Sequence, residues 1–229
     1  MTTAIIGVGN IGSALAATLV RGGEHVVLAS RDLKHAEAIA GDLGAHAATV
    51  GDAITGADVV IFAVWFDVAK DLLARYAGAL SGKIIVDPSN PVTPDGNGGF
   101  TKIIPQDRSA GQILAALVPS DARFVKAFGT QSAQALASNS GRQPPAVQFY
   151  ATDDEAAGTT VAGLIRTSGY TPVVIGGIDQ SIRIEAFGDL HETTLGAAVT
   201  EDEAKRLIWK QPRQTEPATQ AGTHDKIRN

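Results

Sequence analysis

The chain has 229 residues, no cysteine, and 24 Asp and Glu against 19 Lys and Arg, for a formal net charge of −5. This acidic balance argues against nucleic-acid binding, which normally requires a basic face. The lack of cysteine excludes disulfides, thiolate metal sites and cysteine nucleophiles. The sequence contains no run near the roughly 20 apolar residues that span a bilayer, and it begins without the features of a secretory signal. We therefore expect a cytoplasmic protein with neither nucleic-acid nor membrane partners.

Short apolar segments alternate along the chain with longer, alanine-rich ones. The apolar segments predict strands at residues 3–7, 25–30, 58–64, 83–87, 123–127, 147–151 and 171–175. The longer segments predict helices at residues 12–21, 32–41, 66–76, 109–117, 132–137 and 154–168. This alternation is typical of βαβ units around a parallel sheet. It predicts an α/β fold.

Residues 7–12 read Gly-Val-Gly-Asn-Ile-Gly, a GxGxxG motif between a predicted strand and a predicted helix. Gly7 permits a tight turn, Gly9 lets the backbone approach a pyrophosphate, and Gly12 lets the helix pack on the strand. The free N–H groups of the first helical turn would face the phosphates. A glycine turn that merely connects two elements is the alternative, but the flanking strand and helix favour a dinucleotide site on a Rossmann-type fold.

The end of the second predicted strand indicates which dinucleotide is bound. An NAD-binding chain typically carries Asp or Glu there, for the ribose 2′-hydroxyl, whereas this chain carries Ser30 and Arg31. A hydroxyl and a guanidinium suit a 2′-phosphate, which a carboxylate would repel. Lys34 and His35 could add positive charge. The alternative is that Arg31 is a solvated helix-start residue and Asp32 a simple cap, but we expect NADP(H).

Two predicted strand ends carry residues suited to the nicotinamide. Trp65 and Phe66 follow the strand 58–64 and could wall the ring, unless they pack in the core. Asn90 lies in an Asp-Pro-Ser-Asn-Pro run and offers a donor and an acceptor that suit a carboxamide, unless it forms an Asx turn. The connection 89–108 is long and rich in proline and glycine, which is typical of a functional or disordered segment.

The sequence offers no obvious nucleophile, metal-ligand cluster or paired acids. Its histidines are scattered, and the one of interest, His191, is expected to be a helix-terminal or surface residue. Oxidation of alcohols, imines or hydroxy acids generally needs a placed acid, whereas hydride transfer to a flavin-like ring needs mainly positioning. The pattern therefore favours a flavin-type acceptor, with Lys126, Asp87 and Tyr76 left as candidate acids.

Several motifs together resemble the deazaflavin (coenzyme F420)-dependent NADP oxidoreductases, whose domain also occurs in the cytosolic part of membrane ferric reductases. These motifs are the glycine turn, Ser30-Arg31, the run 84–91, Gly99-Phe100, and the segments 107–112 and 124–128. The resemblance implies an NADP(H)-dependent reductase that transfers a hydride between NADP(H) and a deazaflavin or flavin-like acceptor. The cofactor-binding residues that the motif and the resemblance imply are Gly7, Gly9, Asn10, Ile11, Gly12, Ser30, Arg31, Lys34, Val64, Asn90 and Ala127.

The chain departs from that family pattern at two places. His35 stands where the family usually carries a further lysine. Gly129 and Thr130 stand where relatives often have a bulkier polar residue, so we expect a different acceptor pocket.

We expect a Rossmann-type doubly wound parallel sheet with a small C-terminal α/β lobe. The division predicted is an NADP-binding domain at 1–128, a lobe with the acceptor site and a dimer contact at 129–208, and a polar tail at 209–229. Apolar residues within 182–208, with Trp209 just beyond, favour a homodimer.

Two other functions remain open. One is reduction of another small molecule, such as a quinone, ferric chelate, imine or keto compound. Its imine, keto-acid and quinone forms are disfavoured because such enzymes usually append a large helical domain, and too little chain follows Phe128 for one. The other is a non-enzymatic NADP(H) sensor.

Overall fold

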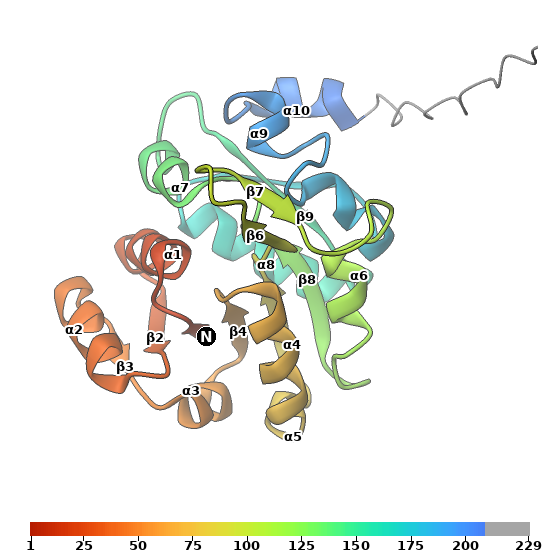
Figure 1. Ribbon diagram of the computed structural model, residues 1–229. Helices are drawn as coiled ribbons and strands as arrows, with labels where there is room; N and C mark the ends of the chain where they lie inside the picture. Colours follow the sequence, from red (N-terminus) through yellow and green to blue (C-terminus); the bar gives the residue numbers. More distant parts are fainter. Residues whose placement is uncertain (209–229) are drawn as a thin grey trace, which may run out of the picture.

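The structure is a computed structural model that describes residues 1–208. Its centre is an eight-stranded sheet in the order β10-β9-β8-β5-β4-β1-β2-β3 (Figure 1). All neighbouring strands are parallel except β8 and β9. The strand bounds are β1 Thr2–Ile6, β2 His25–Ala29, β3 His46–Ala47, β4 Val59–Phe62, β5 Ile84–Asp87, β8 Arg123–Ala127, β9 Val147–Ala151 and β10 Thr171–Val174.

Helices follow most strands, and a separate antiparallel hairpin pairs β6 (Val92–Pro94) with β7 (Phe100–Lys102). In Figure 1 the blue helices α9 and α10 lie at the top of the molecule, at the other end from α2, α3 and α5. The helix bounds are α1 Asn10–Arg21, α2 Leu33–Leu43, α3 Val50–Gly56, α4 Phe66–Arg75, α5 Ala77–Leu80, α6 Ala110–Ala115, α7 Ala133–Asn139, α8 Glu155–Thr167, the 3₁₀ helix η1 Ile178–Ile184, α9 Glu192–Leu195 and α10 Glu201–Ile208.

Both faces of the sheet are covered, which is why the central strand β4 is apolar throughout. Successive side chains of a strand point to opposite faces. In β1, accordingly, Ile6 belongs to one buried cluster and Ile5 to the other. β4 repeats the pattern, with Val60 in the first cluster and Ile61 in the second. The predicted α/β class with a Rossmann-type, doubly wound sheet is confirmed.

The strands predicted at 123–127 and 147–151 are confirmed residue for residue. The strands predicted at 3–7, 25–30 and 58–64 are shorter at their carboxyl ends, because the chain there already turns toward the next element. Sequence analysis missed β3, α3 and α5, which are too short to show a period. It also missed the hairpin β6–β7, because prolines and glycines obscure its alternation.

Residues after 129 continue the same sheet, since β9 pairs with β8 and β10 pairs with β9. The domain boundary at residue 128 therefore falls directly after a central strand, and the predicted division stays a prediction. The predicted tail at 209–229 lies outside the described residues. Among residues 1–208, no helix is long and apolar enough to cross a bilayer.

Candidate functional site

The turn between β1 and α1 requires glycine at two of its three motif positions. Gly7 has a φ of +105°, which side-chain-bearing residues rarely adopt, and its N–H donates to the Ala29 carbonyl across 2.8 Å. A Cβ on Gly12 would lie 1.8 Å from the Gly7 carbonyl oxygen. The helix can therefore start this close to the strand only because Gly12 has no side chain.

The space over Gly9 is open. A Cβ built there would meet no atom within 4 Å. Gly9 is also the N-cap of α1, no side chain caps that helix, and its first turn carries no acidic residue. The first N–H groups of a helix lack intrahelical partners and attract anions. The turn thus combines room for a ligand with backbone donors suited to a phosphate.

At the carboxyl end of β2, the loop into α2 presents a cation to solvent. Arg31 is exposed and, within residues 1–208, forms no ion pair. The Asp32 carboxylate caps α2, because its Oδ1 accepts the backbone N–H groups of Lys34 (3.1 Å) and His35 (3.3 Å). The Ser30 hydroxyl donates to the Asp32 carbonyl across 2.5 Å. Lys34 is exposed in the first turn of α2, beside this loop.

The carboxyl ends of β4, β5 and β8 lie side by side in the sheet and form a second, polar part of the edge. Trp65, after β4, is 55% exposed, whereas its neighbour Phe66 is buried. Phe66 therefore packs in the core. Val64 is half-buried and Ala127, at the end of β8, is buried.

Asn90 lies at the centre of this edge and joins three segments. Its Nδ2 donates to the Gly129 carbonyl (2.9 Å), after β8, and its Oδ1 accepts the N–H of Ala186 (2.7 Å), after η1. Both ends of the side chain thus have protein partners. The close approach of the two strand ends is tight, since a Cβ on Gly129 would lie 2.7 Å from the Pro88 carbonyl oxygen.

Beneath Asn90 lies a buried ion pair. Asp87 and Lys126 are direct neighbours on β5 and β8, with Nζ 2.5 Å from Oδ2, and each residue is 1% exposed. The Lys126 ammonium also donates to the Ser89 carbonyl, and Asp87 Oδ1 accepts the Ser89 N–H (2.9 Å). A buried charge needs a partner and further hydrogen bonds. Here those bonds set the path of the chain toward Asn90.

His191 is a helix-terminal residue, but it is buried and not at the surface, contrary to part of the expectation. Its ring caps α9, because Nδ1 accepts the N–H of Thr193 across 3.2 Å. Burial lowers the pKa of His191 below its usual 6.5, while Glu192 and a hydrogen bond to the Gly129 backbone raise it and Lys126 lowers it. The ring therefore favours its neutral form. It lies beside Gly129, the residue to which Asn90 also donates a hydrogen bond.

Comparison with known proteins assigns this arrangement to a family. The family model for "NADP oxidoreductase coenzyme F420-dependent" matches residues 2–91. A hypothetical protein of Sinorhizobium meliloti superposes with a TM-score of 0.78 and 30% identity, covering 88% of this chain and 96% of its own. Residues 2–91 of the chain thus belong to the coenzyme F420-dependent NADP oxidoreductase family.

Other relatives in and around this family differ in length. A proposed F420-dependent NADP reductase from Arthrobacter sp. superposes with a TM-score of 0.68 and 25% identity, over 79% of this chain and 86% of its own. Metalloreductase STEAP3 of Rattus norvegicus is 31% identical over 183 residues, which are 80% of this chain. The chain spans only 35% of the length of that metalloreductase.

The geometry fits the NADP(H) of this family. The open space over Gly9 and the uncapped start of α1 suit the pyrophosphate, and the exposed Arg31 suits a 2′-phosphate. The predicted cofactor residues thus divide into two groups, one at the turn and α2 and one at the ends of β4, β5 and β8. The adjacency of these strands places both groups on one edge of the sheet.

Sequence analysis missed the contribution of residues 185–191 to this edge. Ala186 contacts Asn90 from 96 residues away, and nothing in the local sequence predicts that contact.

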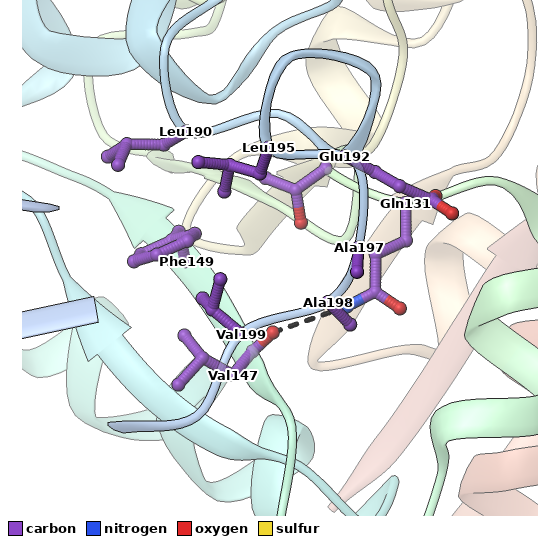
Figure 2. A pocket seen from close by; sticks show the side chains of 10 residues that line it. Gln131, Val147, Phe149, Leu190, Glu192, Leu195, Ala197, Ala198 and Val199 are labelled. Carbon is purple, nitrogen blue, oxygen red and sulfur yellow. Dashed lines mark hydrogen bonds between the residues drawn. The ribbon is translucent and has the colours of Figure 1, made fainter. Parts of the chain in front are cut away.

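Figure 2 shows a pocket further along, where Leu190 and Leu195 face Val147 and Phe149, and Gln131 Nε2 donates to the Val147 carbonyl (3.3 Å). Its volume of about 10 Å³ is room for one water. This pocket is therefore too small to hold a dinucleotide.

Proposed function

We propose that this protein transfers a hydride between NADP(H) and a deazaflavin or flavin-like acceptor. One observation carries the proposal: at the edge where the nicotinamide would lie, the titratable side chains are all engaged within the protein. The Lys126–Asp87 pair is buried and bonded to Ser89, and His191 is buried and favours the neutral form. Among the described residues there, none is placed to give a substrate a proton.

The remaining candidate acid, Tyr76, lies at the far end of α4 from the edge where the nicotinamide would lie. It caps the carboxyl end of α4, a helix that begins next to the carboxyl end of β4 and runs back along the sheet. Reduction of a carbonyl or an imine needs a placed donor. A flavin or deazaflavin ring delocalises the incoming charge itself, so that positioning suffices.

In this proposal NADPH supplies the hydride, and the residues of the chain bind and orient it. The backbone at Gly9, Asn10 and Ile11 binds the pyrophosphate, with Gly7 and Gly12 shaping the turn. Ser30, Arg31 and Lys34 hold the 2′-phosphate. Val64, Asn90 and Ala127 line the nicotinamide ribose and ring, and Asn90 does so with its Nδ2 already bonded to Gly129.

Stopped-flow absorbance of NADPH oxidation tests the proposal. Coenzyme F420, flavin mononucleotide and a ferric chelate are offered separately to the purified chain. Oxidation with F420 or the flavin supports the proposal. Tight NADPH binding without oxidation by any acceptor contradicts it and favours an NADP(H) sensor.

Reduction of a ferric chelate is a second candidate, favoured by the 31% identity to a metalloreductase. NADPH gives up two electrons as a hydride, whereas ferric iron accepts one. A flavin between them would reconcile the two. Ferric reduction that requires added flavin would therefore support both candidates, with the flavin as the direct acceptor. Ferric reduction without flavin would favour the second candidate alone.

We also propose a homodimer through residues 182–208. Leu190 is buried within its own chain, but Leu195 and Leu207 are only half-buried, and Trp209 lies outside the described residues. Light scattering of the purified chain tests this, since a monomer would refute it.

A further inference from the structure

Residues 185–191 connect η1 to α9 and form a tightly bonded loop. The Gly188 N–H donates to the Glu185 carbonyl (2.8 Å), and the Leu190 N–H donates to the Arg183 carbonyl (2.9 Å). The Arg183 guanidinium grips the Asp189 carboxylate with Nη2 at 2.8 Å and Nε at 3.1 Å. These hydrogen bonds and this ion pair fix the conformation of the loop.

Two further contacts fix the 185–191 loop to the rest of the molecule. The Glu185 carboxylate is buried at the start of α6, where it accepts from the Ser109 hydroxyl (2.7 Å) and the N–H groups of Ala110 (2.9 Å) and Gly111 (2.8 Å). On the other side, the Ala186 N–H is bonded to Asn90. The residue after Ala186 is thereby held next to the edge where the nicotinamide would lie.

That residue is Phe187, and two unfavourable features coincide in it. Its φ is +72°, a left-handed conformation that bulky side chains avoid. Its side chain is 53% exposed, which leaves aromatic surface in water. The backbone on its carboxyl side is closely packed, because a Cβ on the next residue, Gly188, would lie 2.4 Å from the Arg183 carbonyl oxygen. Strain held in place by a rigid surround is typical of a functional position.

We propose that Phe187 is a specificity residue that stacks against the planar ring of the hydride acceptor, a flavin or deazaflavin. This inference rests on the proposed function. Phe187 follows directly on Ala186, whose N–H is bonded to Asn90, so it lies beside the edge where an acceptor would meet the nicotinamide. An aromatic side chain stacks favourably on a flat π-system. In this arrangement Phe187 contacts the second substrate.

Replacement by glycine separates this role from a structural one. Phe187→Gly removes the ring and at the same time relieves the left-handed backbone, so the fold is retained. We expect the KM for coenzyme F420 or flavin mononucleotide to rise about tenfold. The Kd for NADPH, from fluorescence titration, and the Tm should not worsen. Phe187→Trp, which restores a flat ring, should return the KM toward the wild-type value. Val174→Ala, at an equally exposed apolar side chain on β10, is the matched control and should change none of these values.

Three results would overturn the inference. An unchanged acceptor KM in Phe187→Gly would show that the ring makes no contact. A weaker NADPH Kd with an unchanged acceptor KM would place Phe187 against the cofactor, and a lower Tm would make it a structural residue. If the wild-type chain itself transfers no hydride to either acceptor, the proposed function fails and this inference fails with it. Assay of the wild-type chain distinguishes a failure of the proposed function from a failure of this inference alone.

Discussion

The side-chain amide of Asn90 donates a 2.9 Å hydrogen bond to the Gly129 carbonyl and so ties the end of β5 to the end of β8. His191 lies beside the same glycine, whose backbone raises the pKa of the ring. Gly129 thus has neighbours from two elements at the point where the nicotinamide ring is proposed to lie. The Gly129 carbonyl already accepts a hydrogen bond from Asn90. It therefore cannot accept one from a ligand that approaches from the same side.

Replacing Asn90 by aspartate should destabilise the protein and slow hydride transfer. A carboxylate still accepts the Ala186 N–H but cannot donate to Gly129, so two acceptors face each other. We expect a loss of about 1–3 kcal/mol in the free energy of unfolding, the range for an unsatisfied buried hydrogen-bonding group, and a lower kcat/KM because the ends of β5 and β8 are no longer tied together. Denaturant unfolding and steady-state kinetics of NADPH oxidation measure the two effects. An unchanged kcat/KM in Asn90→Asp would contradict the role of this bond.

Arg31→Ala should weaken NADPH binding about 10- to 100-fold, because a charge-assisted contact to the 2′-phosphate is lost. The KM for NADH, which lacks that phosphate, should change little. Glu37→Ala, which removes a charged side chain elsewhere on exposed α2, is the control. Equal effects on NADPH and NADH would refute the 2′-phosphate assignment.

Gly12→Ala should both destabilise the protein and weaken NADPH binding. The added Cβ would lie 1.8 Å from the Gly7 carbonyl oxygen, so α1 must move away from the turn. Gly41→Ala is the matched control, since that glycine is also helical and a Cβ there meets nothing within 4 Å. The control should be more stable by about 0.5–1 kcal/mol. Denaturant unfolding measures both, and similar effects of the two changes would contradict the packing argument.

Lys126→Met should cost about 3–5 kcal/mol in the free energy of unfolding, because it leaves the Asp87 carboxylate buried and without its cation. The double variant Lys126→Met with Asp87→Asn removes both charges and keeps an acceptor for the Ser89 N–H. We expect it to recover part of the loss. A double variant as unstable as the sum of the two single variants would show that the pair is not coupled.

Stability should fall as the pH drops below about 6.5. Burial lowers the pKa of His191 in the folded chain, so the unfolded chain takes up the proton first as the solution becomes acidic. The stabilisation is therefore complete above the unfolded pKa and is lost below it. Urea unfolding of wild type and of His191→Gln across pH 5–8 measures the slope. Equal slopes would show that His191 does not contribute.

Much of the cofactor half of this protein follows from residues that are near one another in sequence. The turn at Gly7 to Gly12 is short-range, and so is the choice of Ser30 and Arg31 at the end of β2. Both depend on the conformation of a few adjacent residues, which their own side chains dictate. An apolar run likewise predicted β4, because burial on both faces of a sheet leaves a continuous hydrophobic pattern.

The tertiary structure alone decided how the nicotinamide edge is built. Trp65 and Phe66 are adjacent and both aromatic, yet one is exposed and the other buried, since α4 turns only Phe66 toward the core. Asn90 finds its partners 39 and 96 residues away. Such contacts depend on strand order and on how the 185–191 loop packs, and no local pattern encodes either one. The sequence by itself determined the dinucleotide site, and the packing of distant segments decided what surrounds the reacting end.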